Sequence, residues 1–139
     1  MIHRRDARRA RTVGLQPKKP STPGPAEWFT GEVRLDTIVE ASAQSSFNVA
    51  AVSFAPSART AWHSHEGGQT LYVLEGRGLV QSAGEEIVRL APGDVHVTGD
   101  GEVHWHGATR EDSMRHLSIT RGAASWGEHV AEDDYARQP

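Results

Sequence analysis

Near its middle the chain contains the stretch Trp62-His63-Ser64-His65-Glu66-Gly67-Gly68-Gln69. Successive side chains of a β-strand point to opposite faces of the sheet, so His63 and His65 share one face if this stretch begins as a strand. Two imidazoles spaced in this way can bind one metal ion. The two glycines allow the chain to reverse, which brings the amide oxygen of Gln69 back towards the same point on the next strand. The stretch therefore predicts two neighbouring strands that share a metal site.

A second pair with the same spacing, His104 and His106, occurs later in the chain, and His116 follows it. If one member of this pair faces the interior of the fold, the other does too. A single strand histidine is more often a surface residue or a hydrogen-bonded core residue than a metal ligand. Two such pairs are harder to explain in that way, because each buried polar group without a partner costs roughly 1–3 kcal/mol. We therefore interpret the histidines as a metal site and not as a structural cluster.

Short runs of alternating or β-branched residues surround these histidines, and Gly, Pro, Asn or Asp separate them. The runs are residues 31–39, 46–54, 60–65, 69–74, 78–82, 86–90, 94–98, 104–109 and 114–120. Many short strands with no helical period between them predict an antiparallel sandwich or barrel. Near the C-terminus the pattern changes. Ser125 and Glu128 have the spacing of a capping box, and residues 132–135 suit a short acidic helix or turn.

Composition and charge limit the class of protein. The chain has 139 residues and no cysteine, so we expect one domain without disulfides or thiolate ligands. The first 20 residues have a net charge of +6 and the remainder −9. A basic tail can bind nucleic acid or an acidic membrane surface, but the low apolar content favours a solvated leader. We therefore expect residues 1–25 to be a disordered, basic, proline-rich leader or linker, and residues 26–139 to be the barrel domain.

The sequence also bears on location and partners. It has neither the apolar run of a secretory signal nor the roughly 20 apolar residues of a membrane span. We expect a cytoplasmic protein with a small-molecule substrate and with neither nucleic acid nor a membrane as its partner. Because covering an exposed sheet edge removes an aggregation hazard, we also expect a homodimer or a homotetramer.

The histidines and the glycines around them resemble the two motifs of the cupin superfamily. Its first motif is matched by His63, His65, Gln69 and Gly76, and its second by Gly93, Gly101 and His104. Four positions differ: Ser57 replaces the first glycine, Gln69 the glutamate, Gly99 the proline and Ala108 the asparagine. The resemblance implies an all-β double-stranded β-helix, or jelly-roll barrel, with a divalent metal ion inside it on His63, His65, Gln69 and His104.

A narrower resemblance runs from about residue 24 to residue 135. The stretches 24–31, 58–65 and 104–108 look like the small bacterial cupins related to carboxymuconolactone decarboxylase-associated proteins. That group includes the cupin-type (R)-hydroxynitrile lyases, and it normally has glutamine in place of the glutamate, as here. In the resemblance His116 stands where a catalytic base is expected, and His106 assists or orients it. The stretches 66–67 and 97–100 differ from the group and change the rim of the cavity.

These observations favour a metal-dependent lyase that acts on a small hydroxy or carbonyl compound, with hydroxynitrile-lyase-like cleavage of a C–C bond. Three neutral imidazoles and one amide leave the charge of the ion uncompensated, which makes it a strong Lewis acid. Nitrogen and oxygen ligands suit Mn, Fe, Zn, Ni or Co, and we expect Mn. Two alternatives remain, an iron-dependent cupin oxygenase and a non-catalytic cupin that binds a metal or a small ligand.

The remaining candidates receive less specific predictions. We expect His96 beside the site or at the surface, and His3 and His129 facing solvent. Trp62 and Trp105 neighbour metal-site histidines in the sequence, so by alternation they should point to the outer face of their strands. Arg59 and Arg77 could bind an anionic substrate, but we interpret both as surface charges.

Overall fold

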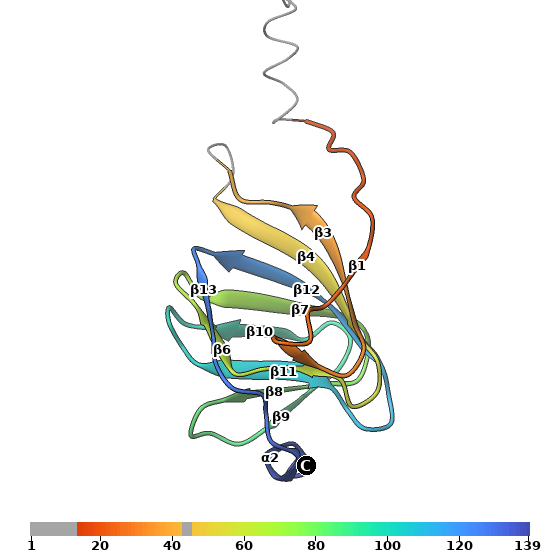
Figure 1. Cartoon of the computed structure of the whole chain (residues 1–139), viewed down its shortest axis with the longest axis vertical. Helices are drawn as coiled ribbons and strands as arrows, with labels where there is room; N and C mark the ends of the chain where they lie inside the picture. The colour runs from red at the N-terminus through yellow and green to blue at the C-terminus, as the bar shows by residue number, and fades with distance from the viewer. Residues whose placement is uncertain (1–13, 43–45) are drawn as a thin grey trace, which may run out of the picture.

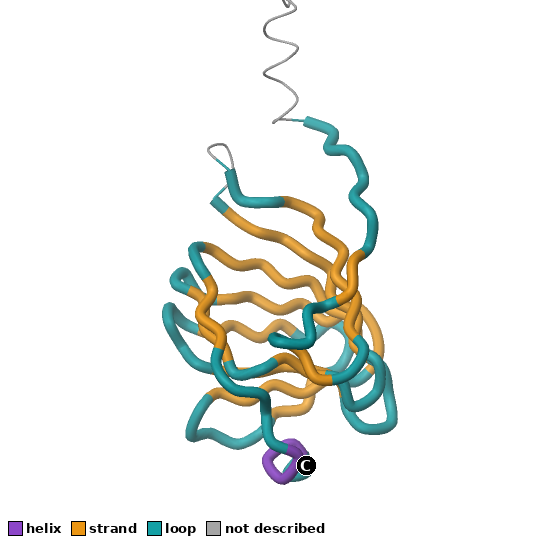
Figure 2. The backbone as a smooth tube through the Cα atoms, in the orientation of Figure 1, coloured by secondary structure: helices purple, strands orange, loops and turns teal. Residues whose placement is uncertain are grey.

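The computed structural model describes residues 14–42 and 46–139. Its strands form two antiparallel sheets that curl around a shared interior, and the short helix α2 (Glu132–Tyr135) lies beyond the second sheet (Figures 1 and 2). This arrangement is the all-β barrel that the sequence predicts. The predicted leader up to residue 13, with His3, lies outside the described residues.

The two sheets are built from strands far apart in the sequence. The first has the strand order β1 (Thr22–Pro23), β3 (Val33–Val39), β4 (Phe47–Phe54), β12 (Met114–Arg121), β7 (Gln69–Gly76) and β10 (Val95–Thr98). The second has the order β13 (Ala124–Trp126), β6 (His63–His65), β11 (His104–Ala108), β5 (Arg59–Thr60) and β2 (Phe29–Thr30), and β8 (Gly78–Ser82) pairs with both β11 and β9 (Val88–Leu90). The histidine pairs therefore lie on β6 and β11, which are hydrogen-bonded neighbours.

All nine runs predicted as strands are strands in the structure, although the run 60–65 is divided into β5 and β6. The sequence analysis missed β1, β2 and β13, which have two or three residues each. β1 lies within the segment that we predicted as a linker and pairs with β3. The capping-box prediction is wrong, because Ser125 lies in β13 and α2 begins only at Glu132, with no side-chain cap at Ala131.

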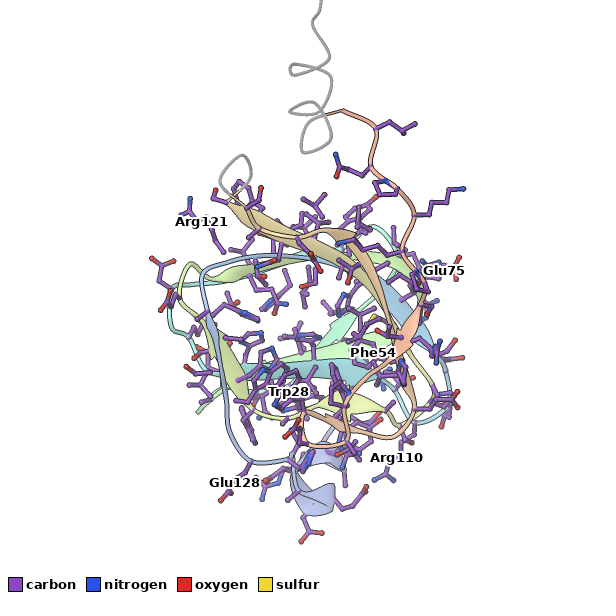
Figure 3. The ribbon with its side chains drawn as sticks, turned by 45° about the horizontal axis from the view of Figure 1, so that its top comes forward. Trp28, Phe54, Glu75, Arg110, Arg121 and Glu128 are labelled. Atoms are coloured by element: carbon purple, nitrogen blue, oxygen red, sulfur yellow. The ribbon has the colours of Figure 1, made fainter. Side chains whose placement is uncertain are left out.

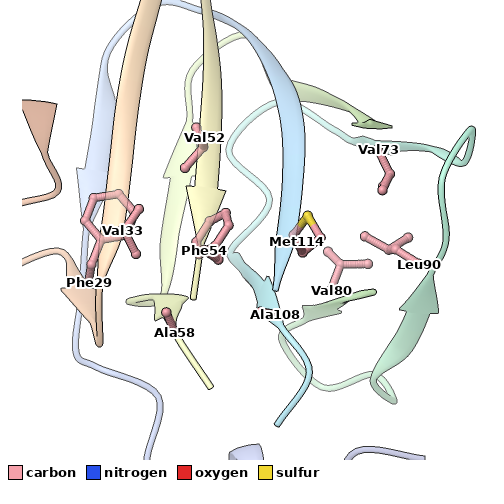
Figure 4. Close-up of a cluster of buried hydrophobic side chains, with 10 residues drawn as sticks. All are labelled: Phe29, Val33, Val52, Phe54, Ala58, Val73, Val80, Leu90, Ala108 and Met114. Carbon is pink, nitrogen blue, oxygen red and sulfur yellow. The ribbon is translucent and has the colours of Figure 1, made fainter. Parts of the chain in front are cut away.

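One part of the barrel interior is an apolar cluster that joins the two sheets (Figure 4). Its members are Phe29, Val33, Val52, Phe54, Ala58, Val73, Val80, Leu90, Ala108 and Met114. Figure 3 shows side chains filling the space around Phe54, whereas Glu75, Arg110, Arg121 and Glu128 lie at the periphery. Full burial of a large apolar side chain contributes about 1.5–3 kcal/mol, so this cluster is a main source of the stability of the barrel.

A second apolar cluster covers the outer face of the second sheet. It contains Leu79, Ile87, Trp105, Val130 and Tyr135, with Trp62 packed against it. The hydroxyl group of Tyr135 donates a hydrogen bond of 2.6 Å to the carbonyl oxygen of Ala108 on β11. The prediction that Trp62 and Trp105 face outward is therefore confirmed, and the C-terminal helix is what covers them.

The interpretation of Arg59 as a surface charge is wrong, because only 2% of this residue is exposed. Its guanidinium group lies 4.2 Å from the ring centroid of Tyr135. It also donates hydrogen bonds to the carbonyl oxygen of Val130 at 3.0 Å and to the carboxylate of Glu132 at 3.1 Å. The C-terminal segment thus buries the charge of Arg59 on the short strand β5.

Two backbone positions require a left-handed conformation. Gly76 ends β7 with φ = +81°, and a Cβ atom there would lie 1.8 Å from the carbonyl oxygen of Ser113. Ser57 has φ = +71°, and it stands where the cupin motif has its first glycine. For a residue with a side chain this conformation costs roughly 1–2 kcal/mol. Ser57 therefore adopts a backbone conformation that favours glycine.

β10 forms one edge of the first sheet, and its Val95 and Val97 are 60% and 66% exposed. The homodimer or homotetramer that we expect from the sequence stays a prediction. Within residues 14–42 and 46–139, no helix has the length and apolar character needed to cross a membrane.

Candidate metal centre

Four strands from both sheets bring six polar side chains into the barrel interior. β6 supplies His63 and His65, β7 supplies Gln69, β11 supplies His104 and His106, and β12 supplies His116. All six are buried, with exposed fractions between 0% and 8%. Alternation along each strand turns these residues inward, while their sequence neighbours point to the outer face. The i, i+2 spacing therefore places both members of each histidine pair in the barrel interior, as expected from the sequence.

The side chains approach each other closely. His104 pairs directly with His63 across the two strands, and their ring centroids are 4.3 Å apart. The centroids of His63 and His65 are 5.0 Å apart. The Oε1 atom of Gln69 lies 2.7 Å from Nε2 of His104. The structure thus brings together all four residues that the sequence analysis proposed as ligands.

One feature of the cluster differs from the expected set. The candidate ligand atoms of His63, His104 and His106 all lie within 4.8 Å of one another, so these three residues form a compact group that can hold a metal ion. We expected His106 to act beside the metal and His65 to bind it. Position alone therefore makes His106 a further candidate ligand, and its hydrogen-bond partners must be considered.

Backbone carbonyl groups fix the orientation of two of the imidazoles. Nδ1 of His63 lies 2.8 Å from the carbonyl oxygen of Ala61, and Nδ1 of His104 lies 3.0 Å from that of Glu102. Because a carbonyl oxygen can only accept, each Nδ1–H donates and each Nε2 presents a lone pair to the interior. This arrangement is typical of histidines that bind a metal.

These lone pairs provide a test of whether the residues fit a metal ion. Nε2 of His104 and Oε1 of Gln69 both present lone pairs at 2.7 Å, which is repulsive unless a positive group lies near both. Nε2 of His65 and Nε2 of His106 are buried without a hydrogen-bond partner among the described residues. Each such group costs about 1–3 kcal/mol. A divalent cation would relieve the repulsion between His104 and Gln69 and give Nε2 of His65 a partner, so the donor set fits a metal ion.

The pKa values of the histidines keep them in the neutral form that a metal requires. Burial, followed by repulsion from His104, lowers the pKa of His63 to about 3. Burial followed by repulsion from His104 lowers the pKa of His65 to about 4. The pKa values of His104 and His106 are also lowered, mainly by burial. The imidazoles therefore do not need to lose a proton at neutral pH before they bind an ion.

His106 and His116 form a hydrogen-bonded pair of imidazoles. Nε2 of His116 lies 3.0 Å from Nδ1 of His106, so one ring donates to the other. Their rings pack against Phe54, with centroid distances of 5.9 Å for His106 and 5.3 Å for His116. Burial lowers the pKa of His116 to about 4. In contrast to His63 and His104, His106 has a partner at Nδ1 that can accept or release a proton.

A cavity of about 190 Å³ opens beside these histidines. Its walls are formed by Trp28, Phe29, Leu35, Ala50, Val52, Thr60, His63, His65, Gln69, His106, Ser118 and Trp126. None of these twelve residues is acidic, and none is Lys or Arg. His106 faces the cavity, and His116 lies behind it with 0% exposure. His116, the residue expected to act as the base, can therefore interact with a molecule in the cavity only through His106.

Two tryptophans that the sequence analysis did not assign to the site form one wall of this cavity. The ring of Trp126 stacks on that of His63 with a centroid distance of 4.5 Å, and Trp28 stacks on Trp126 at 5.1 Å. Trp126 lies on β13, which pairs with β6. The pairing of a three-residue strand could not be read from the local pattern, so no signal in the sequence placed Trp126 beside His63.

The other candidates lie away from the cluster of ligand atoms. His96 is half-buried on β10, and burial lowers its pKa. His129 is exposed, as expected, and its Nδ1 lies 3.4 Å from the hydroxyl group of Thr30. Arg77 is exposed and borders a separate cavity with Arg89 and Asp94.

The fold and this histidine-lined interior define a class of protein that comparison with known families identifies. Residues 50–120 match the cupin domain family, and the chain belongs to that family. It is 45% identical over 118 residues to a protein from Granulicella tundricola named (R)-mandelonitrile lyase. That alignment covers 82% of this chain and 90% of the relative.

Solved structures show the same fold. A cupin-like protein from Thermotoga maritima superimposes with a TM-score of 0.82 and 34% identity, covering 90% of this chain and 97% of that one. A predicted oxalate decarboxylase from Thermotoga maritima superimposes with a TM-score of 0.67 over 79% of this chain and 100% of that one. Its identity of 23% supports the fold alone.

Proposed function

We propose that this cupin is a metal-dependent lyase that cleaves a small, neutral hydroxynitrile into an aldehyde and hydrogen cyanide. The observation that supports this most directly is the apolar cavity, because it joins the candidate ligands to the His106–His116 pair. The name of the relative from Granulicella tundricola supports the same type of reaction.

In this proposal His63, His65, Gln69 and His104 hold a divalent ion, with Mn as the first candidate. A bound ion supplies Lewis acidity, which polarises the oxygen atom of the substrate. His65 and His106 both have a buried Nε2 without a partner among the described residues, so this feature alone does not separate them. His106 is assigned to proton transfer because its Nδ1 is paired with an imidazole and not with a carbonyl group.

The histidine pair moves the proton. His106 lines the cavity, and in this proposal its Nε2 takes the proton of the substrate hydroxyl group, while His116 accepts a hydrogen bond from Nδ1–H of His106 and stabilises the imidazolium ion. The electrons of the O–H bond form the carbonyl group. The C–C bond breaks and cyanide leaves with its electron pair. Cyanide then takes the proton from His106, which restores the neutral pair.

The walls of the cavity indicate the kind of substrate. They contain no charged carboxylate, ammonium or guanidinium group, so an anionic substrate would lose its hydration without gaining an ion pair other than with the metal. The rings of Trp28, Phe29 and Trp126 favour an apolar or aromatic substituent. A neutral cyanohydrin fits these walls better than a dicarboxylic acid does.

The decisive experiment combines elemental analysis with an assay of cyanide release from (R)-mandelonitrile, in air and under anaerobic conditions. We expect one equivalent of a divalent metal, and turnover that is lost on chelation, restored by the metal and independent of oxygen. Turnover only in the presence of oxygen would instead support the oxygenase alternative. Metal or ligand binding without turnover would support a non-catalytic cupin.

A variant tests the role of the histidine pair. We expect His116→Ala to lower kcat by about 10²–10⁴, because the imidazolium form of His106 loses its partner. The metal content should equal that of the unchanged protein, as measured by elemental analysis, because His116 is not a proposed ligand. Unchanged turnover in the metal-loaded variant would exclude this role.

A further inference from the structure

The amide group of Gln69 is held at both of its ends. Oε1 lies 2.7 Å from Nε2 of His104, and Nε2 of Gln69 donates a hydrogen bond of 2.7 Å to the hydroxyl oxygen of Ser118. Gln69 lies on β7 and Ser118 on the neighbouring β12, where Ser118 pairs with Leu71. Both side chains point into the barrel, and Ser118 also borders the cavity. Three strands therefore determine where this one amide group lies.

The position of the amide matters because Gln69 is the one proposed ligand that carries an NH₂ group beside its ligand atom. When Oε1 faces an ion, the two N–H bonds of the amide must point elsewhere. Around this group the cavity wall is formed largely by apolar side chains, among them Leu35, Ala50 and Val52. A buried N–H without an acceptor there would be costly. The hydroxyl oxygen of Ser118 is the acceptor that removes this cost.

We infer that Ser118 is a positioning residue for the metal centre: by accepting a hydrogen bond from the amide of Gln69, it keeps Oε1 directed at the ion beside His104. The same hydrogen bond polarises the N–H bond towards the amide nitrogen, and amide resonance passes this electron density on to Oε1, which makes a neutral ligand a stronger donor. Partners that orient a metal ligand typically change metal affinity by about 10- to 100-fold when they are removed. This inference rests on the metal site of the proposed function.

Two variants of equal shape separate the hydroxyl group from the volume of the side chain. Ser118→Thr keeps a hydroxyl group, whereas Ser118→Val has the same branched shape and lacks it. Ser64→Ala serves as a control, because Ser64 lies between His63 and His65 in the sequence but points to the other face of β6. Thermal unfolding of each metal-free variant, measured first, shows which of them fold.

The measurement is a titration with Mn²⁺ followed by electron paramagnetic resonance, because the sharp signal of free Mn²⁺ reports the unbound fraction. We expect Ser118→Val to weaken binding about 10- to 100-fold, and Ser118→Thr and Ser64→Ala to change it less than about threefold. The Co²⁺-loaded proteins give a second readout. The visible spectrum of Ser118→Val at saturation should differ from that of the unchanged protein, and the spectrum of Ser118→Thr should match it.

A further pair of variants tests whether Ser118 acts through Gln69. In a Gln69→Ala background, Ser118→Thr and Ser118→Val should bind Mn²⁺ equally well, because the amide that distinguishes them is absent. If Ser118→Val bound Mn²⁺ as tightly as the unchanged protein, this inference would fail and the metal site would stand. If the unchanged protein bound neither Mn²⁺ nor Co²⁺, the proposed metal site would fail and this inference with it.

Discussion

The two motif regions, residues 57–76 and 93–108, each contribute one His-x-His pair, but the two pairs differ in what their members contact. In the first region His63 and His65 lie with Gln69 on one side of the cluster. In the second region His104 joins them, whereas His106 forms a hydrogen bond with His116. Equal spacing therefore determines which face a histidine occupies. The partner at Nδ1, a fixed carbonyl group or a second imidazole, determines what the histidine can do.

Acid should have the largest effect on the stability of the metal-free protein, and it tests whether both regions hold their histidines neutral. The pKa is about 3 for His63 and about 4 for His116, compared with an ordinary value of 6.5. Above pH 6.5 neither state binds these protons and the stability is fully present. As the pH falls from 6.5 towards 4, only the unfolded chain binds them, so stability is lost.

Each such group contributes up to about 1.4 kcal/mol per pH unit, so these two alone give a slope of about 3 kcal/mol per pH unit. Urea unfolding of the metal-free protein at pH 7, 6 and 5 would measure it. His63→Gln should flatten the slope by about 1.4 kcal/mol per pH unit. A free energy of unfolding that is constant over this range would show that the histidines are protonated in the folded state.

Removal of single imidazoles should show that His104 and His106, the two members of the second pair, have different roles. We expect His104→Ala to weaken Mn²⁺ binding by more than about 100-fold, because it removes a proposed ligand and leaves Oε1 of Gln69 without the neighbour that shares the ion. We expect His106→Ala to keep the metal and to lose turnover. Isothermal titration of both variants with Mn²⁺ would measure the two affinities. Equal losses of affinity would place His106 among the ligands, as the compact group of His63, His104 and His106 allows.

The smallest expected effect concerns the turn that begins the first region. Ser57 has φ = +71°, whereas Gly93 in the second region has φ = +90° without a side chain to strain. We expect Ser57→Gly to raise the free energy of unfolding by about 1 kcal/mol, measured by urea denaturation, with unchanged metal affinity. A loss of stability would mean that contacts of the serine side chain outweigh the backbone strain.

The sequence predicted those parts of the molecule that depend on local periodicity. Alternation along the strands was enough to turn His63, His65, His104 and His106 inward. The two glycines before Gln69 predicted its return to the same point, and the resemblance to cupins added the role of His116. Local alternation was not enough to predict features that depend on pairing between distant segments. Burial of Arg59 depends on the C-terminal helix, and the stack of Trp126 on His63 depends on pairing of β13 with β6. Neither depends on residues nearby in the sequence.

The hydrogen bond from Tyr135 to Ala108, with Trp105 beneath it, ties the end of the chain to the strand that carries His104 and His106. The C-terminal helix therefore supports, from outside, a strand whose other face carries the buried histidine cluster. If the C-terminal segment were exchanged between related proteins, the residue that packs against Tyr135, here Trp105, would have to be exchanged with it. For the same reason, a purification tag fused after Pro139 would lie close to the contacts that hold this strand.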